Sequence, residues 1–345
     1  MRRLVIGSTR ADAGKTSLIL GLGRAAGGSS GYAKPFGDRL LYRKKRLWDY
    51  DAALVAEVFG LGEDPKDMSI GFDHSKLRFM YDAEGVRQRL EELASSAGSG
   101  KDVLFIEAGS DLTYGASVNL DAVSVARGTG AGLVIVLAGE DRAVLDDMAY
   151  LRRHLDVEGA AFEGVIVNKL QDVEDFRNSY GGEIAELGVR VLGMIPLDPE
   201  LTYPSVGYIS ECLFAKVVTG EDALDSVVKH IFVGAMAAGA ARRLPAFASS
   251  GKLVITSGDR SDMVLAALES DTAGIVLTNG IAPPSSIISK AAERNVPLLL
   301  APEDTFKVAK LIDDASKLLR HNEKDKIERI GALVRDYVDT AALLG

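Results

Sequence analysis

Three consecutive residues near the start of the chain, Gly14, Lys15 and Thr16, could bind phosphate groups together with a divalent cation. A lysine can place its charge against the terminal phosphates of a nucleotide, and a threonine hydroxyl can reach Mg²⁺. The glycine lets the backbone approach a ligand closely, and N–H groups at the start of a helix point at phosphate oxygens. We therefore predict nucleotide binding by Ala13, Gly14, Lys15, Thr16 and Ser17.

The spacing upstream departs from the usual phosphate-binding loop, the P-loop, which is Gly-x-x-x-x-Gly-Lys-Ser/Thr. Counting back from Gly14 puts Thr9 at the position of the first glycine, and the nearest upstream glycine, Gly7, comes two residues too early. The missing glycine removes some freedom of the loop but none of the donors, so we include Thr9 in the predicted site. A surface loop that contains Gly-Lys-Thr by chance is the competing interpretation, which the strand pattern before the loop and the helix pattern after it disfavour.

A carboxylate, Glu107, follows directly after an apolar run at residues 103–106. Sheets of parallel strands bind their ligands at the carboxyl ends of the strands. Because Mg²⁺ prefers hard oxygen ligands, we expect Glu107 to hold it together with Thr16. The alternative is that Glu107 caps a helix.

Short apolar runs that alternate with longer helical patterns must position these residues, and this alternation is typical of parallel α/β architecture. Each run is rich in Val, Ile or Leu, as strands that are buried on both faces require. A first series of predicted strands covers residues 3–6, 103–106, 132–137, 164–167 and 189–194. A second series covers residues 252–256, 273–277 and 296–300.

The chain of 345 residues is long enough for two domains, and the two strand series place the boundary near residues 199–204. We predict a first domain over residues 1–201 and a smaller α/β domain over residues 202–345. Residues 202–243 have a largely helical pattern. Residues 304–344 are also predicted to be helical, because apolar residues recur three and four positions apart; we assign this C-terminal part to the second domain.

Composition excludes several classes of function. The net charge of −9 argues against a nucleic-acid partner, because phosphate contacts need clustered lysine and arginine. A basic run at residues 39–46 is the exception, and it makes an anionic ligand plausible. A single cysteine, Cys212, permits neither an internal disulfide nor a cysteine-based metal site. We find no signal-peptide pattern and no apolar run long enough to span a membrane, so we expect a cytoplasmic protein.

The loop and five later segments resemble dethiobiotin synthetase and its relatives, whose loop reads Gly-Thr-x-x-x-x-Gly-Lys-Thr. This chain has one residue more between its glycines. The later segments are Gly-Tyr-Ala-Lys-Pro at residues 31–35, Asp-Tyr-Asp-Ala-Ala-Leu at 49–54, Phe-Ile-Glu-Ala-Gly at 105–109, Val-Asn-Lys at 167–169 and Leu-Gly-Met-Ile-Pro at 192–196. Each segment is weak alone, but their shared order is specific, and together they span residues 1–200.

The resemblance implies roles for particular residues. Lys34 would contact phosphate and act in catalysis with Lys15, although a solvated lysine is the plainer interpretation. Asp51 would hold Mg²⁺ together with Glu107. Asp49 could take that role instead, and either aspartate could cap the helix that begins near residue 52.

The resemblance also makes Asn168 and Lys169 contacts of the nucleotide base. Guanine recognition normally adds an aspartate two positions after the lysine, and Gln171 stands there, with Asp172 one residue late. We therefore expect ATP rather than GTP, bound with Mg²⁺.

Residues 253–280 resemble a DRTGG domain, which is named for its Asp, Arg, Thr and two glycines. Asp259, Arg260, Thr278 and Gly280 match the motif, whereas Asn279 replaces one glycine. These four matching residues form a possible second ligand site, for an anionic metabolite or a protein partner. Asp259 and Arg260 could equally pair with each other.

A synthetase-like P-loop domain followed by DRTGG resembles the N-terminal part of large phosphotransacetylases. No counterpart of the acetyl-transferring domain follows in this sequence, so we expect no phosphotransacetylase activity from it. Two hypotheses remain: a regulatory or ligand-sensing ATP-binding protein, and an ATP-dependent synthetase that transfers a phosphoryl group to a carboxylate or carbamate. The synthetase family's site lies at a two-fold interface, which predicts a homodimer. The segment Ser-Asp-Leu-Thr-Tyr at 110–114 departs from that family and favours the first hypothesis.

Overall fold

The computed structural model describes residues 1–43, 46–155, 159–315 and 318–345. The chain forms two compact units, each described by itself below. The first unit contains Met1–Asp198 and Leu319–Gly345, and the second contains Pro199–Leu318. The chain thus passes from the first unit to the second after Asp198 and returns after Leu318, whereas the sequence predicted one boundary near residues 199–204.

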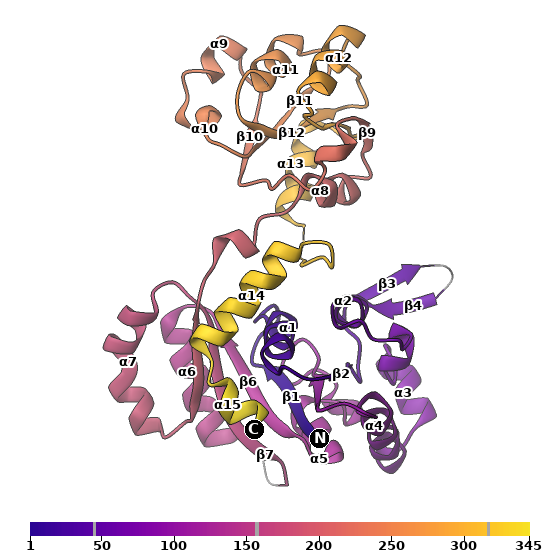
Figure 1. Cartoon of the computed structure of the whole chain (residues 1–345), viewed down its shortest axis with the longest axis vertical. Helices are drawn as coiled ribbons and strands as arrows, with labels where there is room; N and C mark the ends of the chain where they lie inside the picture. The colour runs from indigo at the N-terminus through magenta and orange to yellow at the C-terminus, as the bar shows by residue number, and fades with distance from the viewer. Residues whose placement is uncertain (44–45, 156–158, 316–317) are drawn as a thin grey trace. The chain divides into compact units, whose positions relative to one another are not determined.

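The first unit is built on a sheet of six parallel strands in the order β2-β5-β1-β6-β7-β8 (Figure 1). Every residue of β5 and β6 is buried, as strands with helices on both faces must be. The predicted parallel α/β fold is thereby confirmed. The strands are β1 (Arg2–Ser8), β2 (Ser30–Ala33), β5 (Val103–Glu107), β6 (Gly132–Ala138), β7 (Ala161–Leu170) and β8 (Val191–Pro196).

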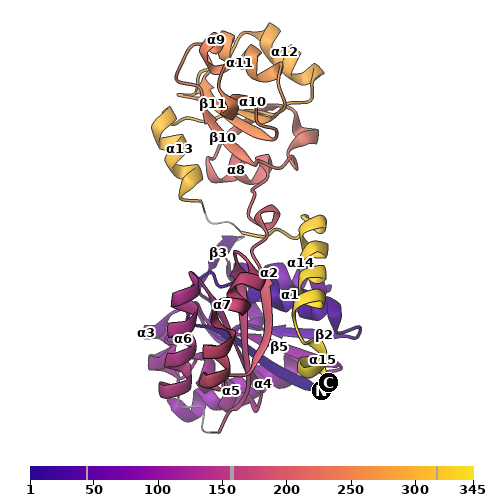
Figure 2. The ribbon, with the colours of Figure 1, turned by 90° about the vertical axis from the view of Figure 1, so that its left-hand side faces the viewer.

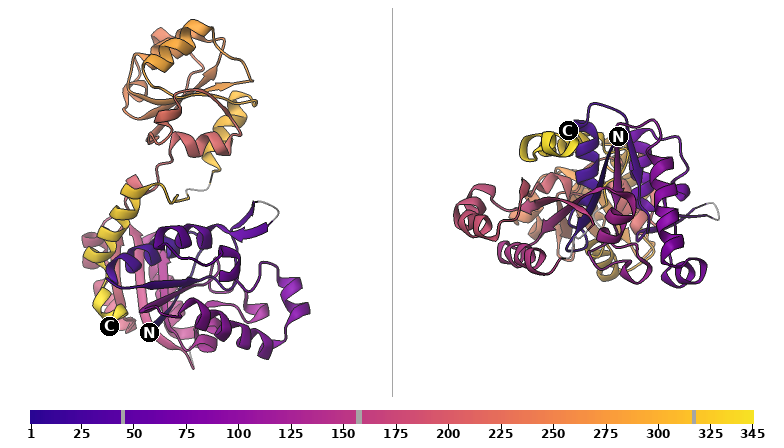
Figure 3. Two further views of the ribbon diagram at one scale, coloured as in Figure 1. Left: turned by 45° about the vertical axis from the view of Figure 1, so that its right-hand side comes forward. Right: turned by 90° about the horizontal axis from the view of Figure 1, so that it is seen from below.

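Helices cover both faces of this sheet (Figures 2 and 3). The apolar side chains of α4–α7 pack with one face, and α1 and α14 lie against the other. The helices are α1 (Lys15–Ala25), α2 (Tyr50–Phe59), α3 (His74–Met80), α4 (Ala83–Ala97), α5 (Ala122–Thr129), α6 (Asp141–His154), α7 (Val173–Leu187), α14 (Lys324–Tyr337) and α15 (Thr340–Leu344).

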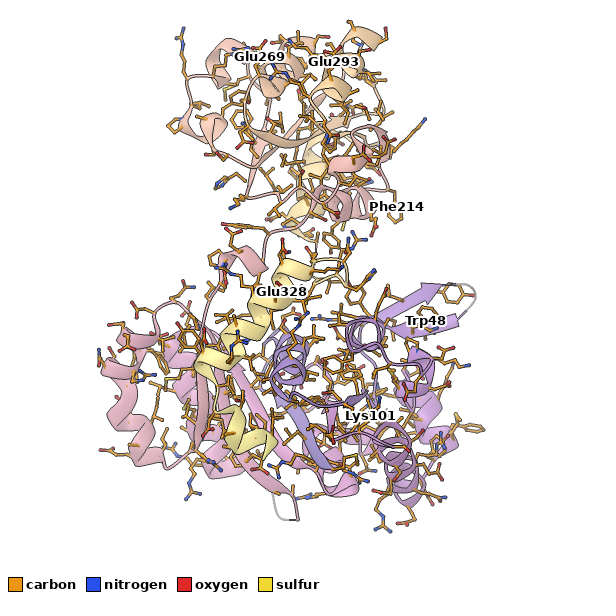
Figure 4. The ribbon with its side chains drawn as sticks, in the orientation of Figure 1. Trp48, Lys101, Phe214, Glu269, Glu293 and Glu328 are labelled. Atoms are coloured by element: carbon orange, nitrogen blue, oxygen red, sulfur yellow. The ribbon has the colours of Figure 1, made fainter. Side chains whose placement is uncertain are left out.

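The C-terminal helices belong to the first unit, which corrects the predicted second domain of residues 202–345. Helix α14, marked by Glu328 in Figure 4, packs closely on α1: a Cβ atom on Gly21 would lie 2.3 Å from Val334 Cγ2. The N–H of Asp339 donates to the carbonyl of Leu192 on β8 over 2.8 Å. Helical periodicity predicted these helices correctly, but it cannot say which core their apolar face covers.

The second unit has a five-stranded sheet in the order β10-β11-β12-β13-β9, in which only β9 is antiparallel to its neighbour. Helices α8 and α13 pack on one face, and α9–α12 pack on the other. The strands are β9 (Lys216–Thr219), β10 (His230–Val233), β11 (Lys252–Ser257), β12 (Thr272–Thr278) and β13 (Leu298–Leu300). The helices are α8 (Val206–Cys212), α9 (Ala238–Ala241), α10 (Pro245–Ala248), α11 (Ser261–Leu268), α12 (Ser285–Glu293) and α13 (Thr305–Asp313).

The prediction that residues 202–243 are largely helical is wrong, since both edge strands of the second sheet, β9 and β10, lie there. Each has four residues, too short to show a clear alternation. A further antiparallel pair, β3 (Leu40–Arg43) and β4 (Arg46–Asp49), forms a hairpin in the first unit, and Trp48 marks it in Figure 4.

Candidate functional site

The glycine-bearing loop lies between β1 and α1, at the carboxyl edge of the first sheet. Gly14 caps the start of α1 with φ +96°, a left-handed conformation that favours glycine. The first intrahelical bond runs from the Leu18 N–H to the Gly14 carbonyl over 3.0 Å. The N–H groups of Lys15, Thr16 and Ser17 precede it, so they have no intrahelical acceptor and are oriented for an anion.

Asn168 and Lys169, at the end of β7, hold the backbone of this loop. The Asn168 side-chain amide donates to the Ala13 carbonyl over 2.8 Å, and Lys169 Nζ donates to the Asp12 carbonyl over 2.6 Å. A Cβ atom on Gly14 would lie 2.4 Å from Asn168 Nδ2, so the approach of β7 requires a glycine there. The two residues thus lie beside the loop, and their predicted contact with the base stays a prediction.

Lys15 is buried, and its ammonium group lies within the loop. Nζ donates to Ser8 Oγ over 2.9 Å and to the Ser110 carbonyl over 3.2 Å. Burial lowers the pKa of Lys15, an effect that nearby Glu107 partly offsets. Neutral oxygens satisfy this ammonium, so its charge is available to a phosphate.

Glu107 and Thr16 meet as the sequence predicted, because β1 and β5 are paired with Ile6 opposite Glu107. Thr16 Oγ1 donates to Glu107 Oε1 over 3.0 Å, and the Tyr32 hydroxyl donates to Glu107 Oε2 over 2.9 Å. Glu107 therefore bonds to side chains at the sheet edge rather than capping a helix. Burial raises its pKa to about 7, against the opposing effect of Lys34.

Lys34 lies at the centre of a cluster of carboxylates and is only 1% exposed. Its Nζ atom is 2.6 Å from Asp51 Oδ2, 2.6 Å from Asp38 Oδ1, 3.3 Å from Asp49 Oδ1 and 3.8 Å from Glu107 Oε1. Burial alone would lower the pKa of Lys34, but Glu107 and Asp51 outweigh it and raise the pKa well above its ordinary value. Lys34 is therefore a buried cation rather than a solvated lysine.

The two aspartates of the 49–54 segment have different tasks. Asp49 is the N-cap of α2, and its Oδ1 accepts from the N–H groups of Asp51 and Ala52 over 2.9 and 3.2 Å. Asp51 lies in the first turn of α2 and directs its carboxylate at Lys34. The structure thus gives Asp49 the capping role beside a longer contact with Lys34, whereas Asp51 makes the shorter ionic contact.

Hard oxygen donors at this edge fit Mg²⁺. Thr16 and Glu107 are adjacent, and Asp38, Asp49 and Asp51 bring carboxylate oxygens within 4.8 Å of one another. The Lys34 ammonium occupies the centre of the second group. Thr16 and Glu107 are consequently the better placed ligands, whereas Asp51 could bind a metal only after exchanging its contact with Lys34.

Thr9 directs both of its donors away from the phosphate-binding loop. Its hydroxyl donates to Asp147 Oδ2 over 2.6 Å, and its N–H donates to the Val136 carbonyl over 3.3 Å. The position that a glycine normally holds is thus fixed to α6 and β6, and nucleotide binding by Thr9 stays a prediction.

The described part of the basic run at residues 39–46 begins just before β3 and includes residues of β3 and β4. Residues 44–45 are outside the described residues, as are the side chains of residues 43 and 46. Arg39 is described, and its guanidinium pairs with Asp12 in the phosphate-binding loop and lies 3.5 Å from Asp51.

The four predicted residues of the second unit lie at the carboxyl ends of β11 and β12. Arg260 donates to the Met236 carbonyl over 2.7 Å and to Asp262 over 3.4 Å, so its ionic partner is Asp262 rather than Asp259. Asp259 is exposed. Thr278 is buried against Thr305, with 3.1 Å between their hydroxyl oxygens.

Gly280 and Asn279 form the turn after β12. Both are left-handed, with φ +63° and +60°, and their N–H groups donate to the carbonyls of Ala301 and Glu303. Asn279 therefore adopts the conformation that the glycine it replaces in the motif would allow.

Sequence reasoning missed three partners at the first site: Ser8, Tyr32 and Asp38. Ser8 accepts a hydrogen bond from Lys15, and Tyr32 donates one to Glu107. Asp38 pairs with Lys34. Tyr32 lies two residues before Lys34, a spacing that places alternate residues of an extended segment on one face. That alternation could have identified Tyr32 from the sequence. No comparable pattern in the sequence identifies Ser8 or Asp38.

No helix in the described part of the chain combines the length and apolar character needed to cross a membrane.

Family models match both units. Residues 2–205 match the family described as AAA domain, and residues 208–315 match the DRTGG domain. The phosphate acetyltransferase of Pseudomonas putida is 27% identical over 375 residues, which cover 99% of this chain and 51% of that protein. The phosphate acetyltransferase of Synechocystis is 29% identical over 201 residues, covering 55% of this chain and 28% of that protein.

The chain thus spans about half the length of the P. putida relative. These matches confirm the predicted resemblance to the P-loop and DRTGG part of phosphotransacetylases. One solved structure that matches contains the CBS and DRTGG domains of Clostridium perfringens pyrophosphatase, complexed with the activator diadenosine tetraphosphate. The two sequences are 25% identical, the match covers 36% of this chain and 50% of that chain, and the TM-score is 0.30. The MinD cell division protein of Aquifex aeolicus matches with 18% identity, 58% of this chain, 84% of that chain and TM-score 0.36.

Proposed function

The chain belongs to the AAA domain family that residues 2–205 match, and on this premise we propose that its first unit binds ATP with Mg²⁺ and that the protein has a regulatory or ligand-sensing role. The observation that supports the proposal best is the meeting of Lys15, Thr16, Lys34 and Glu107 at one edge of the sheet. These residues come from three separate segments of the chain: the start of α1, the position after β2 and the end of β5. They combine phosphate-binding cations with metal-binding oxygens.

Each residue has a defined part in this proposal. The N–H groups of Lys15, Thr16 and Ser17 bind phosphate oxygens at the start of α1. Lys15 and Lys34 neutralise the terminal phosphates, and Lys34 leaves part of its carboxylate cluster to do so. Thr16 and Glu107 hold Mg²⁺, which bridges and neutralises phosphate oxygens when bound. Asn168 and Lys169 fix the loop and contact adenine.

The second unit supports a regulatory role because its corresponding edge gathers no comparable set of charges among the described residues. We propose that it binds an anionic metabolite or a protein partner near Asp259, Arg260, Thr278 and Gly280. We also propose that the protein is a homodimer.

A synthetase that transfers a phosphoryl group is the second candidate, because the set Lys15, Lys34, Thr16, Asp51 and Glu107 would suffice to stabilise such a transfer. The loop that follows β5 leaves little room for a pocket that could bind the acceptor substrate. The ring of Tyr114 lies 2.1 Å from where a Cβ atom of Gly109 would be, and its centroid is 4.9 Å from that of Phe36. An aromatic ring thus fills the space beside Gly109, close to the residues that would activate the phosphate.

Calorimetric titration of the full chain with ATP, ADP and GTP, with and without Mg²⁺, tests the proposal. We expect ATP to bind more tightly than GTP and more tightly with Mg²⁺. Failure to bind any of these nucleotides would refute it. Incubation with ATP and candidate amines or carboxylic acids, followed by product analysis, separates the two candidates: a phosphorylated or condensed product would replace the sensor by the synthetase.

A further inference from the structure

Arg39 makes a contact that the proposed ATP site does not require. Its guanidinium forms an ion pair with the carboxylate of Asp12, which belongs to the phosphate-binding loop itself. The two residues are 27 positions apart, so the contact joins the segment before β3 to the loop before α1. An arginine is thereby held at the surface where the phosphates of a nucleotide would approach.

The backbone of Arg39 is fixed independently of this ion pair. Its N–H donates to Asp49 Oδ2 over 3.0 Å, and its carbonyl accepts from the Tyr50 N–H over 2.7 Å. Asp49 also caps α2, so the start of that helix and the position of Arg39 depend on the same carboxylate. Exchange of the side chain's partner therefore needs only rotations of the side chain.

Arg39 also belongs to the constellation that would meet the terminal phosphate. Its Nη1 atom is 3.5 Å from Asp51 Oδ1, and Asp51 Oδ2 is 2.6 Å from Lys34 Nζ. Lys34 in turn lies near Glu107, the predicted ligand of Mg²⁺. A series of hydrogen-bonded and ionic contacts thus runs from Thr16 at the start of α1 through Glu107, Lys34 and Asp51 to Arg39.

Asp12 is an unfavourable residue for a phosphate-binding loop. Its side chain is 75% exposed, and its carboxylate would repel an incoming anion unless Arg39 neutralised it. A carboxylate and a phosphate compete for the same guanidinium, and both can accept two parallel hydrogen bonds from it. A nucleotide with a terminal phosphate in reach would offer Arg39 the more highly charged partner.

We propose that Arg39 is a further phosphate-binding residue, held by Asp12 in the nucleotide-free chain and transferred to the terminal phosphate when a nucleoside triphosphate binds. The inference rests on the proposed ATP site. Its consequence is discrimination: Arg39 strengthens binding of ATP but not of ADP, which lacks the phosphate group that it would contact. Asp12 competes with the terminal phosphate for the guanidinium and thereby lowers the affinity for ATP.

Titration of the full chain with Mg-ATP and with Mg-ADP tests this assignment. Arg39→Ala should weaken ATP binding about tenfold or more, since a charge-assisted hydrogen bond is lost, and should change ADP binding less than about twofold. Arg39→Lys keeps the charge without the planar fork and should be intermediate. Arg87→Ala is the matched control, because Arg87 lies on α4 and pairs with Glu84, 2.6 Å away, and should leave the preference for ATP over ADP unchanged.

Substitution of Asp12 tests whether Arg39 binds phosphate or only neutralises the Asp12 carboxylate. If Arg39 binds phosphate, Asp12→Ala should bind ATP at least as tightly as the wild type, and Arg39→Ala should still weaken ATP binding in the Asp12→Ala background. If Arg39 only neutralises Asp12, its removal in that background should have no effect, which would overturn the proposal.

Equal losses for ATP and ADP would also overturn it, and unchanged urea midpoints would show that the variants fold. A wild-type chain that binds neither nucleotide would refute the ATP site itself. A wild type that binds ATP normally while Arg39→Ala is silent would refute only the role of Arg39.

Discussion

The carboxyl edges of the two sheets differ in how they handle charge. At the edge of the first sheet, Lys15, Lys34, Asp49, Asp51 and Glu107 are all buried and lie in ionic or hydrogen-bonded contact. At the edge formed by β11 and β12, the buried polar residues are the neutral Thr256 and Thr278. The second unit's buried lysine, Lys252, lies at the opposite end of β11 and donates to two backbone carbonyls.

This difference favours the edge of the first sheet as the functional site. Removing ionised groups from water is costly, and their mutual attraction often does no more than balance that cost. Buried ionisable groups with perturbed pKa values therefore concentrate at functional sites. Burial raises the pKa of Glu107 to about 7, while carboxylates raise that of Lys34 despite its burial. In the second unit, burial lowers the pKa of Lys252, and Asp271 offsets only part of this effect.

The buried lysines give the largest expected contrast. Lys34→Met removes the central cation from a cluster of four carboxylates and should reduce the free energy of unfolding of the first unit by about 3–5 kcal/mol. Lys252→Met leaves only carbonyl oxygens unpaired and should cost the second unit about 1–2 kcal/mol. Urea denaturation, followed by a probe in each unit, measures both values. Equal costs would contradict the view that charge is organised differently at the two sites.

Lys15 gives the largest expected effect on binding. Lys15→Ala removes the cation that faces the terminal phosphates and should abolish measurable ATP binding, a loss of about 100-fold or more. Lys290→Ala in the second unit is the control, because in the described part of the chain that lysine pairs with the exposed Glu269. Calorimetry with Mg-ATP measures both. Undiminished affinity of Lys15→Ala would remove the phosphate site from the first unit.

Glu107 tests the metal. Glu107→Gln keeps the shape of the side chain but loses the charge that Mg²⁺ prefers. We expect ATP affinity with Mg²⁺ to fall about tenfold and affinity without Mg²⁺ to stay nearly unchanged. Glu91→Gln, which alters an exposed partner of Arg3, is the control. If both affinities fell equally, Glu107 would have a structural role and another carboxylate would bind the metal.

The sequence predicted the first site better than it predicted its surroundings. Lys15, Thr16 and Glu107 could be found because each follows a strand or starts a helix, and the ends of such elements meet at a sheet edge. The role of Lys34 came from resemblance, since β2 has only four residues and gives little pattern of its own. Asp38 could not be found, because its contact with Lys34 arises only when a loop folds back. The assignment of α14 to the wrong domain has the same origin: periodicity identifies an apolar face but not its partner.

The smallest expected effect concerns coupling between the two units. A sensor requires that nucleotide binding in the first unit changes the second, and coupling free energies are commonly about 1–3 kcal/mol and reciprocal. Asp259→Ala removes an exposed carboxylate at the edge of the second sheet, far in the sequence from the predicted phosphate-binding residues. It should shift apparent ATP affinity by about threefold to tenfold if its site and the ATP site are coupled. Glu293→Ala, which removes a charge from the end of α12, should have no such effect.

Hydrogen exchange provides the reciprocal measurement. Amide exchange at residues 251–280 should differ between the nucleotide-free protein and the protein with Mg-ATP, because a coupled unit must change the stability of its own backbone hydrogen bonds. The same comparison in Lys15→Ala should show no difference, which separates binding at the phosphate loop from a direct effect of ATP on the second unit. If exchange and the Asp259→Ala affinity are both unchanged, the units act independently. The second edge would then bind its partner without reporting on nucleotide, and the synthetase hypothesis would account better for the buried charges of the first edge.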